Sequence, residues 1–491
     1  MTIFENLKKI RAYRKQPMWG LQDEVLRAFA QDHNLQLAVA QAVKVASEKA
    51  PQLAALQEVS EEEAGLRIQD RIYNFYAPEA INPYVPLAAQ GPWIVTLTGC
   101  VLHDSGGYGM LGLGHNPPCL DGLWQEPQVM ANVMTPSLEQ LELIENLDLE
   151  IGRNRAQGSG PVYDGYLFLN SGSESVTMAS RIADVNSKIQ TKPGGAYEGK
   201  KLAYLSVQGS FHGRTDKPAQ VSDSCLETYR KHLASFEKRS NLYAVPSNDP
   251  AALKNAFDRA VKDGAFIEAV FLEPVMGEGN PGVAITPEFY ATARRLTLEA
   301  NSMLVIDSIQ AGLRTRGVLS IVDYPGFENL PAPDLETFSK AINAGQFPLS
   351  VLAMGKRAGE LHRVGLYGNT MTGNPRAMRI ASCVLKAQTA ALRQNIVKQG
   401  DFFLHCFREL MQQYPRIIEY VRGTGLLFAV GINSEVIDVL GADGLEKRLR
   451  HCGIGVIHGG ENALRFTPHF AITPEEVRMI VAQVEAVIQK I

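Results

Sequence analysis

Short apolar runs alternate with longer amphipathic stretches over residues 93 to about 375. The clearest runs lie at 166–169, 201–205, 269–272 and 303–306. Apolar runs of this length are typical of strands buried on both faces of a sheet, and the amphipathic stretches between them fit helices. Their regular alternation predicts βαβ units and a mostly parallel sheet covered on both faces, which is an α/β fold.

The flanking segments follow other patterns. Residues 1–92 are alanine-rich and have the apolar spacing of helices, whereas residues 376–491 mix helical stretches with short apolar runs. The last helix is expected to open with the capping-box pattern at 473–476. Because 491 residues are too many for one core, we predict three parts. The first is a helical segment at 1–92 that joins the small domain and covers the functional site. The others are a large domain at 93–375, which is expected to contain that site, and a small α+β domain at 376–491.

Composition and charge narrow the choice of partners. The formal net charge of −4 gives no general attraction to nucleic acid or to anionic membranes, so any anion site must be local. The six cysteines are scattered without a Cys-x-x-Cys pair, which fits free thiols in a reducing compartment. The chain begins without an apolar core of signal length, and no window approaches about 18 uninterrupted apolar residues. We therefore expect a cytoplasmic protein with neither a membrane nor a nucleic acid as partner.

One lysine and one carboxylate stand out by their positions. Lys340 lies in the small-residue stretch 338–345, and Asp307 ends the apolar run 303–306. Pyridoxal phosphate (PLP) chemistry needs such a pair. The lysine holds the PLP aldehyde as a Schiff base, and the carboxylate keeps the pyridine nitrogen protonated so that the ring accepts electrons from the substrate carbon.

Two turns that follow predicted strands contain further residues that could contact a cofactor or a substrate. Residues 170–175, Asn-Ser-Gly-Ser-Glu-Ser, lead into a helix, where backbone N–H groups and the helix dipole favour a phosphate. They form neither a Walker loop nor a Gly-x-Gly-x-x-Gly fingerprint, so taken alone they are a generic turn. Residues 210–215 offer Phe211 for stacking on a planar cofactor and Arg214 for gripping a carboxylate. Taken alone, an ordinary surface loop explains them better.

Together with residues 271–279 and 367–375, these motifs resemble the class III aminotransferases. That family of fold-type I PLP enzymes includes the ornithine, 4-aminobutyrate, acetylornithine and lysine ε-aminotransferases. The resemblance runs from about residue 93 to residue 491, through at least six motifs in family order. It implies the PLP-dependent transferase fold of type I, with a mostly parallel seven-stranded sheet in a large domain and a smaller α+β domain.

The resemblance also implies a role for each matching residue. Lys340 is expected to be the Schiff-base lysine and proton carrier, and Asp307 the partner of the pyridine nitrogen. Gly172 and Ser173 correspond to the phosphate cradle. Thr370 is expected to reach the phosphate of the neighbouring subunit, which implies a homodimer with composite sites. The full set of implied cofactor contacts is Gly172, Ser173, Phe211, His212, Asp307, Gln310, Lys340 and Thr370.

Four residues are implied as substrate contacts. Tyr108 falls in the family's N-terminal substrate-contacting stretch, and Arg214 matches an arginine that binds a substrate carboxylate. Glu278 and Arg465 match a switch pair in which the carboxylate masks the arginine for the amine donor and frees it for a keto acid. The implied reaction moves an amino group, expected to be the terminal one of an amino acid or diamine, to 2-oxoglutarate by a ping-pong mechanism.

The chain departs from the family pattern at several positions. Ser308 replaces the glutamate that commonly follows the aspartate, Met276 stands where glutamine is frequent, and residues 341–345 alter the glycine-rich tail after the lysine. None of these changes removes a named cofactor contact. They indicate a divergent branch, so the substrate cannot be copied from any one relative.

Two alternatives stay open at the level of sequence. Relatives on the same fold racemise or epimerise, shift amino groups or decarboxylate, and these reactions share Lys340 and Asp307. A non-catalytic PLP-fold binding protein is also compatible with the altered sequence around Ser308. A metal site is not expected, because His115 and His212 lie in turns that the family explains and no ligand spacing supports one.

Overall fold

The computed structural model describes residues 2–12, 19–123, 125, 127–131, 133–156 and 160–491. Its contacts divide the chain into two compact units. The central unit is Gly122–Gln394, and the discontinuous unit combines Met1–Asp121 with Asn395–Ile491.

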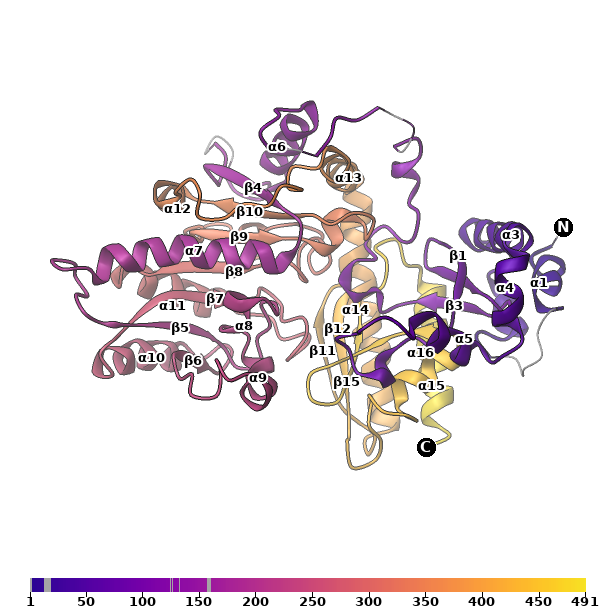
Figure 1. Ribbon diagram of the computed structural model, residues 1–491. Helices are drawn as coiled ribbons and strands as arrows, with labels where there is room; N and C mark the ends of the chain where they lie inside the picture. The colour runs from indigo at the N-terminus through magenta and orange to yellow at the C-terminus, as the bar shows by residue number, and fades with distance from the viewer. Residues whose placement is uncertain (1, 13–18, 124, 126, 132, 157–159) are drawn as a thin grey trace. The chain divides into compact units, whose positions relative to one another are not determined.

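The central unit is built on a seven-stranded sheet (Figure 1) in the order β4-β10-β9-β8-β7-β5-β6. All neighbouring pairs are parallel except those that β10 makes with β9 and β4, which are antiparallel. The strands are β4 (Gly165–Leu169), β5 (Lys201–Val207), β6 (Leu242–Val245), β7 (Ala265–Leu272), β8 (Met303–Asp307), β9 (Leu335–Phe338) and β10 (Ser350–Met354). The four apolar runs thus lie in strands, which confirms the predicted α/β fold with a mostly parallel sheet.

Helices cover this sheet, and every residue of β7, β8, β9 and β10 is buried. The long helix α7 contacts β4 and β7 to β10, whereas α10 and α11 contact β7. The helices of this unit are α6 (Leu138–Glu150), α7 (Gly172–Thr191), α8 (Asp216–Ala219), α9 (Leu226–His232), α10 (Pro250–Lys262), α11 (Pro287–Glu299), α12 (Lys356–Leu361) and α13 (Pro375–Lys386).

The discontinuous unit contains two four-stranded sheets. The first, in the order β1-β2-β3-β13, joins β1 (Pro86–Gln90), β2 (Trp93–Thr96), β3 (Val101–Asp104) and β13 (Ile454–Gly455). The second, β11-β12-β15-β14, joins β11 (Ile418–Thr424), β12 (Leu427–Ile432), β15 (Ala463–Phe466) and β14 (Ile457–Gly459). Its helices are α1 (Ile3–Arg11), α2 (Asp23–Ala28), α3 (His33–Glu48), α4 (Ala50–Gln57), α5 (Glu61–Gln69), most of α14 (Ala390–Gln413), α15 (Leu445–His451) and α16 (Pro474–Ile488). Thr473 and Glu476 close the predicted capping box of α16.

The compact units depart from the predicted domain limits at 92/93 and 375/376. Residues 93–121 group with the two ends of the chain because β2 pairs with β1 and β3 pairs with β13 near the C-terminus. Helix α13 stays in the central unit, where it packs on α6. Strand pairing over more than 300 residues of sequence therefore decides where the units divide.

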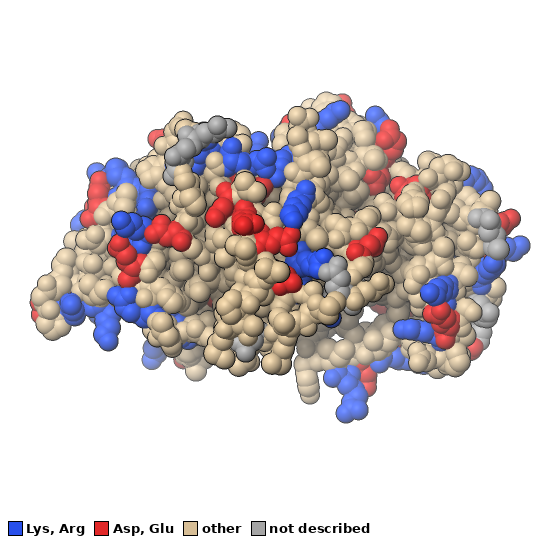
Figure 2. Space-filling model, turned by 90° about the horizontal axis from the view of Figure 1, so that it is seen from above, with Lys and Arg blue, Asp and Glu red and all other residues tan. Residues whose placement is uncertain are grey.

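The distribution of surface charge and the state of the cysteines agree with the expectations from the composition. The face in Figure 2 carries Lys and Arg side chains interspersed with Asp and Glu, and no extended area of one sign. All six cysteines are free. Within the described residues, no helix combines the length and the apolar character that crossing a membrane requires.

Candidate active site

Asp307 is the last residue of β8 and is 4% exposed, at the centre of the large sheet. Its Oδ2 lies 2.9 Å from Nδ1 of His212. Its Oδ1 accepts hydrogen bonds from the backbone N–H of Ile309 at 3.2 Å and from the Thr337 hydroxyl at 3.3 Å. Three donors from three segments thus fix the orientation of this buried carboxylate.

The buried His212 ring connects Asp307 to the loop that follows β5. The backbone N–H of His212 donates to the Ser222 hydroxyl at 2.8 Å, and this hydrogen bond anchors the loop. While Nδ1 meets Asp307, Nε2 is buried and has no hydrogen-bond partner among the described residues. Buried polar atoms are normally paired, so this nitrogen marks a place where a partner group is missing.

Glu273, directly after β7, is a site residue that the sequence motifs did not single out. Its Oε1 accepts the backbone N–H of Phe211 at 3.0 Å, and its Oε2 accepts that of Gly277 at 2.9 Å. Burial raises the pKa of this carboxyl to about 7, and Asp307 adds to the rise, while His212 and the two N–H donors oppose it. A glutamate directly after the apolar run 269–272 was the available signal.

The turn from β4 into α7 has the form of an anion cradle. Ser171 caps α7, and the Glu174 carboxylate accepts the N–H groups of Asn170 at 2.7 Å and Ser171 at 3.2 Å. A Cβ on Gly172 would lie 2.5 Å from Cδ1 of Ile309, so glycine lets the turn pack closely against the segment that follows Asp307. The turn therefore brings Gly172 and Ser173, at the positive end of a 20-residue helix, close to the sheet edge that carries Asp307.

Lys340 reaches the same sheet edge from the neighbouring strand. In the parallel pair β8–β9, Asp307 faces Thr337, and Lys340 follows three residues later at the start of a 3₁₀ turn, Lys340–Asn343. Its φ of 51° is left-handed, a conformation that is strained for a residue with a side chain and that persists where the surroundings enforce it. Gln310, also predicted, is buried in the segment after Asp307.

Ser308, at the most conspicuous departure from the family pattern, is bonded to a carboxylate from the next strand. Its hydroxyl donates to Oε1 of Glu336 at 2.5 Å. The fully buried Glu336 also accepts from Tyr163, Ser320 and the N–H of Ile321. Burial raises the pKa of Glu336, and these four donors oppose the rise. A carboxylate is thus present beside residue 308, although it is supplied by β9.

Glu278 pairs with Arg214 in this structure. The Arg214 Nη2 donates to Oε1 of Glu278 at 2.9 Å, and the guanidinium carbon lies 5.2 Å from the centre of the Phe211 ring. Arg465, the predicted partner of Glu278, is a buried residue of β15 in the discontinuous unit. The contact between Glu278 and Arg465 stays a prediction.

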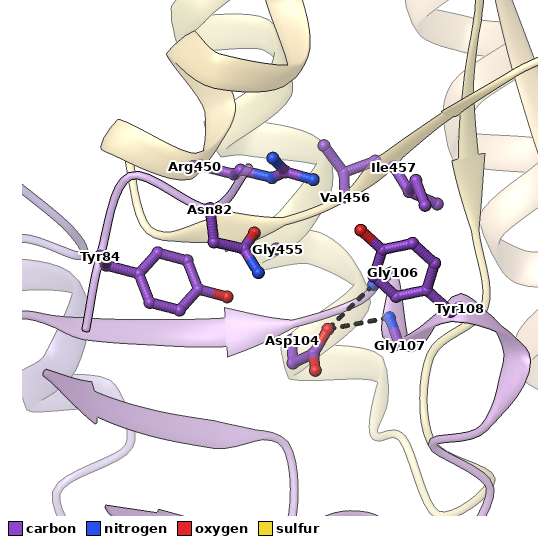
Figure 3. A pocket seen from close by; sticks show the side chains of 10 residues that line it. All are labelled: Asn82, Tyr84, Asp104, Gly106, Gly107, Tyr108, Arg450, Gly455, Val456 and Ile457. Atoms are coloured by element: carbon purple, nitrogen blue, oxygen red, sulfur yellow. Dashed lines mark hydrogen bonds between the residues drawn. The ribbon is translucent and has the colours of Figure 1, made fainter. Parts of the chain in front are cut away.

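Tyr108 lines a cavity of about 50 Å³ within the discontinuous unit (Figure 3). Its φ of 49° is left-handed, and burial raises the pKa of its hydroxyl. Tyr84 and Arg450, which the sequence motifs did not single out, line the same cavity. The complete lining is Asn82, Tyr84, Asp104, Gly106, Gly107, Tyr108, Arg450, Gly455, Val456 and Ile457.

An anion and a cation lie in this lining, each with its own partners. The Asp104 Oδ1 accepts the N–H groups of Gly106 and Gly107, drawn as dashed lines in Figure 3, and Oδ2 lies 3.1 Å from the His115 ring. Although burial opposes ionisation, these contacts lower the pKa of Asp104. Arg450 donates to the carbonyl of Ala80 and is ion-paired with Glu446. Asp104 and Arg450 are thus held by other residues of the protein, and the lining also contains the polar side chains of Asn82, Tyr84 and Tyr108.

Thr370 is exposed in the loop between α12 and α13. Tyr367 and Asn369, in the same loop, donate to Oε1 of Glu174 at 2.9 and 3.0 Å. These bonds hold the loop against the first turn of α7, the predicted phosphate turn. The reach of Thr370 into a neighbouring subunit stays a prediction.

A buried cluster of possible metal ligands occurs elsewhere, in the discontinuous unit. His103 Nε2 and His469 Nε2 lie 3.1 and 3.2 Å from Oε1 of Glu476, and the three groups could hold an ion. Although burial favours the neutral acid, the two histidines bring the pKa of Glu476 well below its usual value. Hydrogen bonds already satisfy these atoms, so we assign the cluster a structural role at the start of α16.

A comparison of the sequence with models of known protein families identifies the family of this chain. The sequence model described as aminotransferase class-III matches residues 75–488. The chain belongs to the class III aminotransferases. This family uses PLP, so the predicted family, enzyme class and cofactor are confirmed.

Solved class III aminotransferases share the fold. An ornithine aminotransferase from Toxoplasma gondii ME49 superposes with a TM-score of 0.73 at 22% identity, over 89% of this chain and 98% of the other. An N-acetylornithine aminotransferase from Stenotrophomonas maltophilia K279a gives 0.65 at 22% identity, over 87% and 98%. The Plasmodium falciparum ornithine δ-aminotransferase gives 0.69 at 20% identity, over 88% and 99%. At such identities the likeness shows the fold of type I and leaves the substrate open.

Proposed function

We propose that this class III aminotransferase moves the terminal amino group of an amino acid or diamine to 2-oxoglutarate. The observation that carries the proposal is the loop 210–215. One of its residues, His212, is bonded to the buried Asp307, and two residues later Arg214 presents a partly exposed guanidinium. Arg214, which we expect to bind a substrate carboxylate, thus lies in the loop that His212 hydrogen-bonds to Asp307, the residue expected to contact the cofactor.

The residues of the central unit fit PLP. When bound, PLP supplies an electron sink for the substrate carbon that loses a proton. Asp307, oriented by three donors, would hold the pyridine nitrogen, and Gly172 and Ser173 would hold the phosphate at the α7 N-terminus. Phe211 would cover the ring and His212 and Gln310 would flank it. Lys340 would bind the aldehyde and then carry the proton.

For the substrates, we assign carboxylate binding to Arg214 and the gating of Arg465 to Glu278. Tyr108 would contact the donor from the cavity that it shares with Tyr84. An amine donor and a keto acid would use the same pocket in turn, because a cation offered to one substrate can be neutralised for the other.

We further propose a homodimer with composite sites, in the cytoplasm. Exposed apolar side chains gather before and on α6, which packs on α13, the helix after the Thr370 loop. Unpaired apolar patches of this kind mark protein interfaces. They are Val129, Met130, Val133, Met134, Leu138 and Leu141. Six free cysteines fit a reducing compartment.

Glutamate formation from 2-oxoglutarate tests the proposed reaction. Purified holoenzyme would be incubated with lysine, ornithine, 4-aminobutyrate, β-alanine or a diamine, and glutamate would be measured for each donor. We expect glutamate with at least one donor. No glutamate with any of them, together with racemised or decarboxylated donor, would assign the protein to another PLP reaction on this fold.

A further inference from the structure

Glu336 is a fully buried carboxylate of β9 that none of the proposed steps of amino transfer involves. Its Oε1 accepts the Ser308 hydroxyl at 2.5 Å and the backbone N–H of Ile321 at 3.0 Å. Its Oε2 accepts the hydroxyls of Tyr163 at 2.7 Å and Ser320 at 2.5 Å. Four donors thus surround the two oxygens, which is what a carboxylate requires when it is held ionised away from water.

Glu336 and Thr337 hold the ends of β8 and β9 together from opposite faces of the sheet. In this parallel pair, Ile306 lies beside Glu336 and Asp307 lies beside Thr337. Successive side chains along a strand point to opposite faces, so Glu336 and Thr337 lie on different faces. Thr337 donates to Oδ1 of Asp307 at 3.3 Å, whereas Glu336 accepts from Ser308, the residue directly after Asp307. Asp307 is therefore held directly from one face and through its chain neighbour from the other.

The bond between Ser308 and Glu336 is a strong constraint on the chain at this point. A hydrogen bond to an ionised group is stronger than one between neutral groups. A buried carboxylate that loses a donor is costly, so the position of Ser308 is tied to that of Glu336. The arrangement is a feature of this chain, because Ser308 stands where the family commonly has glutamate.

We propose that Glu336 is a positioning residue for PLP, which acts through Ser308 on the orientation of the Asp307 carboxylate. Hydrogen bonds weaken steeply as their geometry departs from linear, so a small rotation of Asp307 would weaken its contact with the pyridine nitrogen. A group that binds a cofactor is held precisely when the residues behind it are themselves fixed. The inference rests on the proposed contact between Asp307 and PLP and adds the residue that keeps Asp307 in place.

Two serines form a matched pair for the test. Ser308→Ala and Ser320→Ala each remove one buried hydroxyl that lies 2.5 Å from an oxygen of Glu336. Only Ser308 is next to Asp307 in the chain. Ser320 also accepts the N–H of Val322, so its loss should cost at least as much stability. Urea denaturation of the two apoproteins should therefore show a similar destabilisation, or a larger one for Ser320→Ala.

PLP binding should separate the two variants. Titration of the apoprotein with PLP should show about fivefold weaker binding to Ser308→Ala, the scale of one hydrogen bond, and native affinity for Ser320→Ala. The visible circular dichroism of bound PLP depends on how the ring is held, and it should decrease in Ser308→Ala alone. In Glu336→Ala both properties should decrease. Adding Ser308→Ala to that variant should weaken PLP binding no further, because the serine then has no carboxylate to act through.

Asp307→Asn separates this inference from the contact on which it rests. If Asp307→Asn weakens PLP binding and Ser308→Ala does not, Glu336 has only a structural role and the proposal is wrong. Equal losses of PLP affinity in Ser308→Ala and Ser320→Ala would also overturn it, because the effect would then follow stability. Native PLP affinity in Asp307→Asn would remove the proposed contact and the inference together, while the glutamate assay still judges amino transfer. If Glu336→Ala does not fold, the comparison of the two serine variants still decides.

Discussion

Asp307 ends β8, and Lys340 follows the end of the neighbouring parallel strand β9 by two residues. Asp307 faces Thr337 across β8 and β9, so Lys340 emerges at the same sheet edge. We expect Lys340→Ala to retain the fold and to lose covalently bound PLP. Borohydride reduction of the native protein, followed by peptide mapping, should place the cofactor on residue 340. A label on another side chain would contradict this assignment.

The raised pKa of the buried Glu273 leads to a second prediction at the scale of single residues. Because burial raises its pKa from 4.5 to about 7, the folded protein binds more protons than the unfolded chain between these pH values. The contribution of Glu273 to stability therefore decreases as the pH rises through this window, by about 1–3 kcal/mol.

Glu273→Gln cannot titrate, so the stability advantage of the native protein over the variant should shrink between pH 5 and pH 7. Chemical denaturation of both proteins across this range measures the difference. A difference that is constant with pH would show that Glu273 is already ionised at pH 5.

Single residues were predictable where chemistry and local sequence coincide. Asp307 could be found because it ends the apolar run 303–306, Lys340 because it lies in a stretch of small residues, and Gly172 because it opens a helix after a strand. The partner of Ser308 could not be found, since Glu336 is distant in sequence and is brought close only by the pairing of β8 with β9. The contact of Glu278 with Arg214 likewise depends on two loops meeting in space.

At the scale of elements, the junction of β4 and α7 depends on the absence of a side chain at residue 172. In Gly172→Ala, the new Cβ would lie 2.5 Å from Cδ1 of Ile309, so the Ile309 side chain or the turn would have to shift. We expect a loss of about 1–3 kcal/mol in the free energy of unfolding and weaker PLP binding.

Gly359→Ala is the matched control for this substitution. Gly359 lies inside α12, and a Cβ there meets nothing within 4 Å. This variant should be as stable as the native protein or more stable, because alanine favours the helix. Thermal unfolding and PLP titration compare the two variants. Equal PLP affinity in both would show that the turn does not hold the phosphate.

At the scale of the whole molecule, the sequence indicated the large sheet, but its predicted division at 92/93 and 375/376 differs from the two compact units. The sheet was predictable because four of its strands contain apolar runs, at 166–169, 201–205, 269–272 and 303–306. The grouping of residues 93–121 with the C-terminal part was not, because it depends on β3 pairing with β13, and the two-residue strand Ile454–Gly455 has no pattern of its own. Long-range pairing of short strands carries little local signal.

The exposed apolar segment around α6 supplies the last prediction. Met134 and Leu138 are 82% and 81% exposed, an arrangement that favours burial against a second copy of the chain. The double variant Met134→Glu/Leu138→Glu should dissociate the proposed dimer in sedimentation velocity experiments, because charged side chains would be buried at the interface. If Thr370 reaches the phosphate of the neighbouring subunit, the same variant should also bind PLP more weakly.

Val261→Glu, on the exposed side of α10, is the control and should change neither property. A dimer that persists in the double variant would place the interface elsewhere, and a monomer with native PLP affinity would show that each site is complete within one chain.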